Sequence, residues 1–182
     1  MISRRDLLVL GAGVAAAGSL STSSAHAAVH PRLDRSIYLY NTHTGEFLRT
    51  VYWHSGHYQP AAMRQINKIM RDHYSGDVRT MDPKIIDLVA LMQSKLGPHR
   101  PVHIVCGYRS PRTNAMLRRN TDGVAAHSLH MEGKAIDLRI EGLSIEHLGR
   151  FARSLRRGGV GQYPDSDFVH VDVGKIRTWD AG

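Results

Sequence analysis

One stretch of the chain, AHSLHMEGKAIDLRI at residues 126–140, gathers side chains that commonly bind metal ions. It contains His130 and Asp137, which are separated by six residues with Gly133 between them. The glycine would let the chain turn out of a loop and into a strand. Along that strand Asp137 and Arg139 would share one face. A histidine on the preceding loop could therefore reach back to Asp137.

A third candidate ligand is His170, which lies in another apolar, alternating segment near the end of the chain. If its strand lies close to that of Asp137, two imidazoles and one carboxylate converge and leave a fourth position open to water. That is the composition of a catalytic zinc site. The alternative is that these are ordinary structural residues, because the chain has 12 histidines and some fall near carboxylates by chance. The spacing alone leaves both interpretations open.

The run from Ser128 to Asp137 resembles the Ser-x-His-x-x-Gly-x-Ala-x-Asp signature of the D-Ala-D-Ala metallopeptidases. These belong to one superfamily with the lysostaphin-type enzymes and the hedgehog signalling domain. The segments CGYRSPRTN, GGVGQYPDSDFVHVDVG and IRTW occur in the same order and resemble those of the YcbK-like murein endopeptidases. The resemblance extends over residues 37–179. It implies a zinc peptidase that hydrolyses peptide cross-links between peptidoglycan stem peptides.

The resemblance also implies roles for individual residues. One Zn²⁺ per chain would be bound by His130, Asp137 and His170. It would lower the pKa of its bound water to about 7 and polarise the scissile carbonyl. Arg109 matches an arginine that lies near the substrate carbonyl or carboxylate in carboxypeptidase relatives. A guanidinium suits a catalytic role beside an oxyanion because it stays charged and offers several donors.

The sequence offers more than one interpretation of the carboxylates that could include the general base. The carboxypeptidase relatives carry an acid three residues before the last histidine, where Asp167 stands in this chain, and that carboxylate could pass the water proton to the leaving amine. Asp167 could instead be a turn residue. Asp172 shares the strand face of His170 and could orient its imidazole. His127 could hydrogen-bond the substrate, take the place of a metal ligand, or simply lie in solvent.

Periodicity along the chain predicts the elements that position these residues. Residues 36–40 and 46–53 alternate around a turn and predict a β-hairpin. Helices are predicted at 59–74, 82–97, 111–120 and 144–156, and strands at 101–110, 133–140, 158–163 and 167–174. Asp82 and Ser144 are predicted helix caps. We expect an α+β fold of the hedgehog and D-Ala-D-Ala peptidase type, with a mostly antiparallel central sheet, flanking helices and a preceding β-hairpin.

The first 27 residues are typical of a secretory signal peptide. Arg4 and Arg5 precede an apolar run from Leu7 to Leu20, which resembles a twin-arginine export signal. An ordinary general-export signal is the alternative. The apolar run is too short for a permanent transmembrane helix. Residues 28–182 are then expected to form a single domain in the periplasm.

Composition limits the partners. The formal net charge is +8, which favours an anionic partner such as peptidoglycan. The chain contains no nucleic-acid-binding motif, and export makes a nucleic-acid partner a poor fit. Cys106 is the only cysteine, so no internal disulfide can form. We interpret it as a small buried side chain.

Two other functions stay open beside the endopeptidase. Hedgehog domains suggest that such a scaffold can serve as a zinc-containing peptidoglycan-binding module without catalysis. A zinc D,D-carboxypeptidase would use the same chemistry but would need a pocket closed around a terminal carboxylate.

Overall fold

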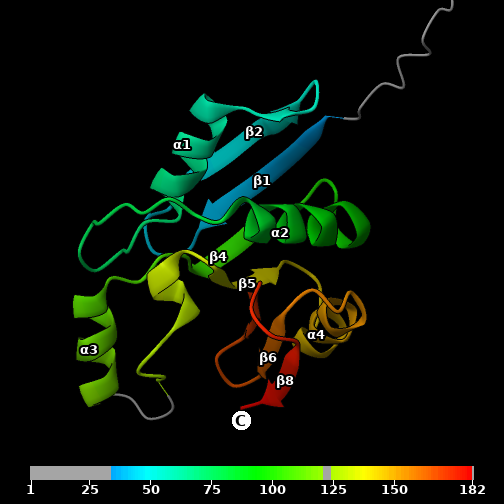
Figure 1. Cartoon of the computed structure of the whole chain (residues 1–182). Helices are drawn as coiled ribbons and strands as arrows, with labels where there is room; N and C mark the ends of the chain where they lie inside the picture. The colour runs from blue at the N-terminus through cyan, green and yellow to red at the C-terminus, as the bar shows by residue number, and fades with distance from the viewer. Residues whose placement is uncertain (1–33, 121–123, 182) are drawn as a thin grey trace, which may run out of the picture. The chain divides into compact units, whose positions relative to one another are not determined.

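The structure is a computed structural model that describes residues 34–120 and 124–181. The expected signal peptide at residues 1–27 lies outside the described residues. Within them, eight strands form one sheet in the order β3-β2-β1-β4-β5-β7-β6-β8 (Figure 1). The strands are β1 Arg35–Asn41, β2 Phe47–His54, β3 His57–Tyr58, β4 Val102–Cys106, β5 Ala135–Ile140, β6 Gly159–Tyr163, β7 Phe168–Asp172 and β8 Arg177–Asp180. The helices are α1 Pro60–Ile69, α2 Pro83–Leu96, α3 Pro111–Asn120 and α4 Ile145–Ser154, with a short 3-10 helix η1 at Leu129–Glu132.

The sheet is mixed but mostly antiparallel, which confirms the expected α+β class. In the described part of the chain, five of the seven strand pairs are antiparallel. The pairs β1–β4 and β6–β8 are parallel. The predicted hairpin is β1–β2, but it does not stand apart in front of the sheet. Because β1 also pairs with β4, the hairpin is an integral part of the sheet.

One hydrophobic core joins alternate strand residues to the apolar faces of α1, α2 and α4. On β5, Ile136 and Leu138 are fully buried in this core. Fully burying such a side chain contributes about 1.5–3 kcal/mol. The pleat then turns Asp137 and Arg139, which alternate with them, to the other face of β5. The apolar pattern of this strand therefore decides where its polar side chains point.

The predicted helix starts are confirmed at two helices. Asp82 accepts a hydrogen bond from the Lys84 backbone at 2.9 Å, and Ser144 accepts one from the His147 backbone at 3.2 Å. The short elements β3, η1 and β8 were not predicted. Each has two to four residues, too few to show a period in the sequence. Gly133 ends η1 with a φ of 69°, so it provides the predicted turn into β5.

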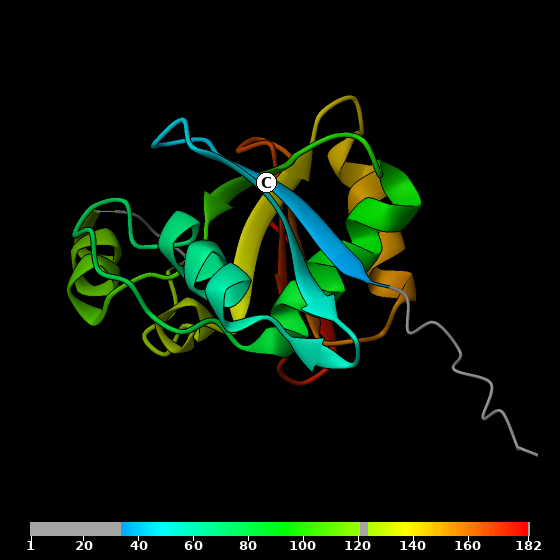
Figure 2. The ribbon, with the colours of Figure 1, turned by 90° about the horizontal axis from the view of Figure 1, so that it is seen from above.

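α3 and η1 lie on the opposite side of β5 from α2 and α4, as both views show (Figures 1 and 2). The segment between β4 and α3, residues 107–110, is anchored by Asp72, whose exposed fraction is 1%. Asp72 accepts hydrogen bonds from the Ser110 backbone at 2.8 Å and from the Tyr74 backbone at 2.9 Å. Asp72 therefore positions the segment that carries Arg109. Among the described residues, none of the helices has the length and apolar content needed to cross a membrane.

Asp72→Asn should test this anchor. Burial raises the pKa of Asp72, but hydrogen bonds from Thr113 and Ser110 outweigh it and lower the pKa from 3.8 to about 2. The substitution removes a charged acceptor and should lower the free energy of unfolding at neutral pH by about 1–3 kcal/mol. Because the folded-state pKa is lowered, the Asp72 carboxylate contributes its full stabilisation above pH 3.8. That stabilisation is lost as the pH falls through about 2.

Urea unfolding of the parent and Asp72→Asn at neutral and acidic pH measures the effect. The difference in unfolding free energy should shrink as the pH approaches the folded-state pKa of Asp72. A difference that acid leaves unchanged would contradict the anchoring role.

Candidate metal-binding site

The three predicted ligands converge where β5, β7 and η1 meet. Asp137 on β5 and His170 on β7 are direct partners across the antiparallel pair. His130 extends from η1 toward both. Its Nε2 lies 3.2 Å from Asp137 Oδ1 and 3.2 Å from His170 Nδ1, and His170 Nδ1 lies 2.8 Å from Asp137 Oδ1. Three potential ligand atoms thus surround one point.

Hydrogen bonds on the far side of each ring fix which nitrogen faces that point. His130 Nδ1 lies 2.8 Å from the carbonyl oxygen of Gly107, which can only accept, so Nδ1 carries the proton. His170 Nε2 lies 3.1 Å from Asp172 Oδ2 and donates to that carboxylate. In the neutral rings, His130 Nε2 and His170 Nδ1 therefore present lone pairs to the same point.

This donor set fits a zinc ion. Zinc binds imidazole nitrogen and carboxylate oxygen at about 2.0–2.2 Å, so two ligand atoms in a tetrahedral shell lie about 3.3 Å apart. The three observed separations of 2.8–3.2 Å are close to that spacing. Three protein ligands leave one position for water or substrate, as in catalytic rather than structural zinc sites.

Burial and charge make the cluster strongly coupled. His130, Asp137 and His170 are all buried. Burial raises the pKa of Asp137, but His130 and His170 lower it more, so that the pKa lies well below its ordinary value. Burial lowers the pKa of His130, and Asp137 and Cys106 raise it well above its ordinary value. A buried carboxylate thus stays charged and available to a cation.

Asp172 is completely buried and lies two residue pairs along the β5–β7 ladder from the Asp137–His170 pair. Its carboxylate accepts hydrogen bonds from the backbones of Gly159 at 2.9 Å and Gly174 at 2.8 Å. Arg177 Nη2 lies 2.7 Å from Asp172 Oδ2. The sequence indicated that Asp172 shares a face with His170, and the two side chains are in contact. Arg177 is not among the site residues predicted from the sequence.

Arg109 lies beside the cluster, next to Asp137 and Cys106. Its Nη2 is 3.7 Å from Asp137 Oδ2 and 3.5 Å from Cys106 Sγ. A hollow of about 200 Å³ opens next to Arg109 and Asp137. Other side chains that line it are His43, His73, Tyr74, Tyr108 and Phe168. The rings of His43 and His73 stack with centroids 3.6 Å apart, and the sequence analysis attached no role to either.

Cys106 belongs to this site as well, which the sequence analysis did not anticipate. Its Sγ and ligand atoms of His130 and Asp137 all lie within 4.8 Å of one another. A register shift between Ile104 and Cys106 makes Cys106, rather than Val105, the partner of Asp137. This bulge turns the thiol toward the site rather than the core. The side chain is only partly buried, unlike the buried one we interpreted from the sequence.

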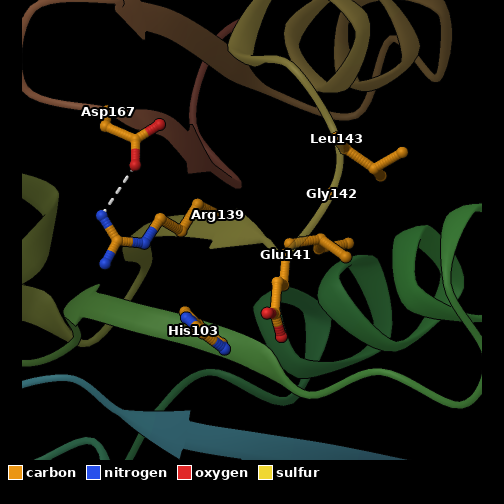
Figure 3. Close-up of a pocket in the computed structure, with 7 residues that line it drawn as sticks. His103, Arg139, Glu141, Gly142, Leu143 and Asp167 are labelled. Atoms are coloured by element: carbon orange, nitrogen blue, oxygen red, sulfur yellow. Dashed lines mark hydrogen bonds and ion pairs between the residues drawn. The ribbon is translucent and has the colours of Figure 1, made fainter.

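Two predicted residues lie outside the cluster. Asp167, in the β6–β7 turn, accepts a hydrogen bond from Arg139 Nη1 at 2.8 Å (Figure 3). Both line a second hollow of about 370 Å³, with His103 and Glu141 also at its wall (Figure 3). His127 is exposed and contributes to none of the hydrogen bonds described for the cluster. The structure therefore brings together His130, Asp137, His170, Asp172 and Arg109, but not Asp167 or His127.

Comparison with known proteins gives the family. A family model described as peptidoglycan L,D-endopeptidase MepK matches residues 27–179. Peptidoglycan L,D-endopeptidase MepK of Escherichia coli (strain K12) is 37% identical over 177 residues, which cover 97% of this chain and 97% of that protein. The probable peptidoglycan L,D-endopeptidase MepK of Haemophilus influenzae is 40% identical over 178 residues, 97% of this chain and 95% of that protein. These matches confirm the resemblance seen in the sequence, and the chain belongs to the MepK family.

Proposed function

We propose that the protein is a zinc-dependent peptidoglycan endopeptidase that hydrolyses peptide cross-links in the bacterial cell wall. One observation carries this proposal: His130 Nε2, His170 Nδ1 and the carboxylate of Asp137 converge on one position beside an open hollow. The relatives in E. coli and H. influenzae are named as peptidoglycan L,D-endopeptidases, and the latter as a probable one. Their similarity extends over nearly the whole chain, which supports the same substrate class here.

In this proposal each residue at the site has a separate task. His130, Asp137 and His170 hold the zinc ion, which when bound supplies a Lewis acid that activates water and polarises the scissile carbonyl. Asp172 keeps His170 in the tautomer that presents Nδ1. Arg109 places its guanidinium 3.7 Å from Asp137, where it can donate to the oxyanion that develops on the substrate.

The hollows beside β5 support an endopeptidase over a D,D-carboxypeptidase. Asp137 lines the hollow beside Arg109, and Arg139, two residues further along the same strand face, lines the second hollow. A cross-link continues on both sides of the bond that is cut, so its hydrolysis needs space on both sides of the zinc ligands. A carboxypeptidase would instead need a wall closed around a terminal carboxylate. Two hollows lined by residues two positions apart on β5 support an extended path for such a substrate.

The first test concerns the metal. The purified protein should bind about one zinc per chain, and His130→Ala or Asp137→Ala should remove most of it, because two remaining ligands hold zinc poorly. Zinc at 100 times its dissociation constant should stabilise the parent by about 2.7 kcal/mol, and the variants by much less. Metal analysis and thermal unfolding with and without zinc measure both effects. Stoichiometric zinc in both variants would exclude this ligand set.

The second test concerns the reaction. The zinc-loaded parent should convert muropeptide dimers with an L,D cross-link into monomers, with the products identified by mass. Uncross-linked stem peptides serve as the carboxypeptidase control and should keep their terminal residue. A zinc-loaded parent that binds peptidoglycan but cleaves neither substrate would favour the non-catalytic binding module. Release of the terminal residue alone would favour the carboxypeptidase.

The same assay tests Asp167 as the general base. Asp167→Asn keeps the side-chain volume and removes its basicity. If Asp167 takes the water proton, the variant should keep its zinc and lose at least about 100-fold in cleavage rate. To take that proton the carboxylate must leave Arg139, with which it pairs at 2.8 Å. A parental rate in Asp167→Asn would show that the base is another group.

We also propose that the protein acts in the periplasm after export through the signal at residues 1–27. Replacing both Arg4 and Arg5 by lysine should block export if the twin-arginine route is used. Cell fractionation followed by immunodetection compares the variant with the parent. Normal accumulation of the variant in the envelope would indicate the general export route instead.

A further inference from the structure

The last strand, β8, places two side chains against the candidate metal site. Arg177 contacts Asp172 at two points, with Nη2 2.7 Å from Oδ2 and Nη1 3.2 Å from Oδ1. The ring centroid of Trp179 lies 5.2 Å from that of His170. The Arg177 guanidinium also lies over the Trp179 ring, 5.0 Å from its centroid. β8 therefore contacts both the ligand His170 and the carboxylate that supports it.

The two oxygens of Asp172 have different partners. Oδ1 accepts from the backbones of Gly159 and Gly174, whereas Oδ2 faces His170 Nε2 at 3.1 Å. Oδ2 can face the imidazole only in one rotation of the carboxylate. A guanidinium that contacts both oxygens fixes the carboxylate plane more firmly than a single donor does. Arg177 is thus placed to set the direction of the acceptor on which the His170 tautomer depends.

The neighbouring strand β6 is shaped to admit these side chains. A Cβ atom at Gly159 would collide with Arg177 Nη1 and with Asp172 Oδ2. A Cβ atom at Gly161 would collide with the indole ring of Trp179. The parallel pairing of β6 with β8 sets Gly159 opposite Arg177 and Gly161 opposite Trp179. Each of the two β8 side chains therefore crosses β6 at a position without a side chain.

We propose that Arg177 is a positioning residue that acts through Asp172 to hold His170 with its Nδ1 directed at the metal. This role rests on the proposed zinc-dependent function. Arg177 makes none of the hydrogen bonds to the proposed ligand atoms and does not line the hollow beside Arg109, so its direct polar contact toward His170 is the Asp172 carboxylate. Loss of the two-point contact should leave the His170 ring less ordered and weaken zinc binding.

A purely structural role for Arg177, as a tether for β8, makes a different prediction. The chain offers a matched control, because Arg153 on α4 also holds β8. Arg153 Nη2 binds the Asp180 carboxylate and donates to the Trp179 carbonyl oxygen at 3.3 Å. Arg153→Met removes this tether without touching Asp172. The two substitutions therefore separate docking of β8 from orientation of His170.

The experiment measures the zinc dissociation constant by competition with a chelator, together with thermal unfolding of the metal-free proteins. Arg177→Met should weaken zinc binding by about 10- to 100-fold, as expected for removal of a group that orients a ligand. Arg177→Lys keeps the positive charge but loses the paired donors of the guanidinium. Its zinc dissociation constant should lie between those of Arg177→Met and the parent. Arg153→Met should keep the parental dissociation constant for zinc, even if it lowers the unfolding temperature as much as Arg177→Met does.

Parental zinc affinity in Arg177→Met would overturn the inference and leave the proposed zinc site intact. An equal loss of affinity in Arg153→Met would also overturn it, because β8 docking would then explain the effect. If Arg177→Met does not fold, Arg177→Lys takes its place in the comparison. The inference then stands only if Arg177→Lys loses more zinc affinity than Arg153→Met does. A parent that binds no zinc would overturn the zinc site itself and this role with it.

Discussion

The register between β5 and β7 is the constraint on which the site depends. The pair Asp137–His170 lies directly across it, between the pairs Ile136–Val171 and Leu138–Val169. Those four apolar side chains are fully buried, so the hydrophobic core holds the two strands in this register. A slip by one residue would turn the polar side chains of one strand into the core. Hydrophobic burial on one face therefore fixes the distance between the ligands on the other.

The sequence predicts the part of the site that follows from local pattern. Alternation along residues 135–140 places Asp137 on the polar face of a strand, and the same rule pairs Asp172 with His170. Helix caps and apolar periodicity likewise predict α2 and α4 to within a few residues. The convergence of His130, Asp137 and His170 depends on the pairing of β5 with β7 and on the position of η1 beside them. No local sequence pattern predicts either. For that step the resemblance to a peptidase family supplied the expectation, and in the structure the three side chains lie together.

Other features depend on contacts between segments that are distant in sequence. The bulge in β4 brings Cys106 to the site, whereas a regular strand would have turned it toward the core. β8 has mostly exposed residues and is a strand because it pairs with β6, so no periodicity predicts it. The segment IRTW contributed to the family resemblance, but its pattern assigned no role to Arg177. The pairing of Asp167 with Arg139 likewise needs the β6–β7 turn to fold over β5. In each case the tertiary arrangement, rather than the local sequence, decides the role of the residue.

Two carboxylates flank His170, and each has its own arginine. Burying a carboxylate is costly unless it is paired and hydrogen-bonded. Asp172 is fully satisfied, by Arg177, two backbone amides and His170, so it is a fixed acceptor. Arg109 stands off at 3.7 Å from Asp137, and its Nε is buried without a hydrogen-bond partner among the described residues. In the proposed function, the Asp172–Arg177 pair holds His170 in place as a ligand. Arg109 then has a free donor that could bind a substrate carbonyl as charge develops on it.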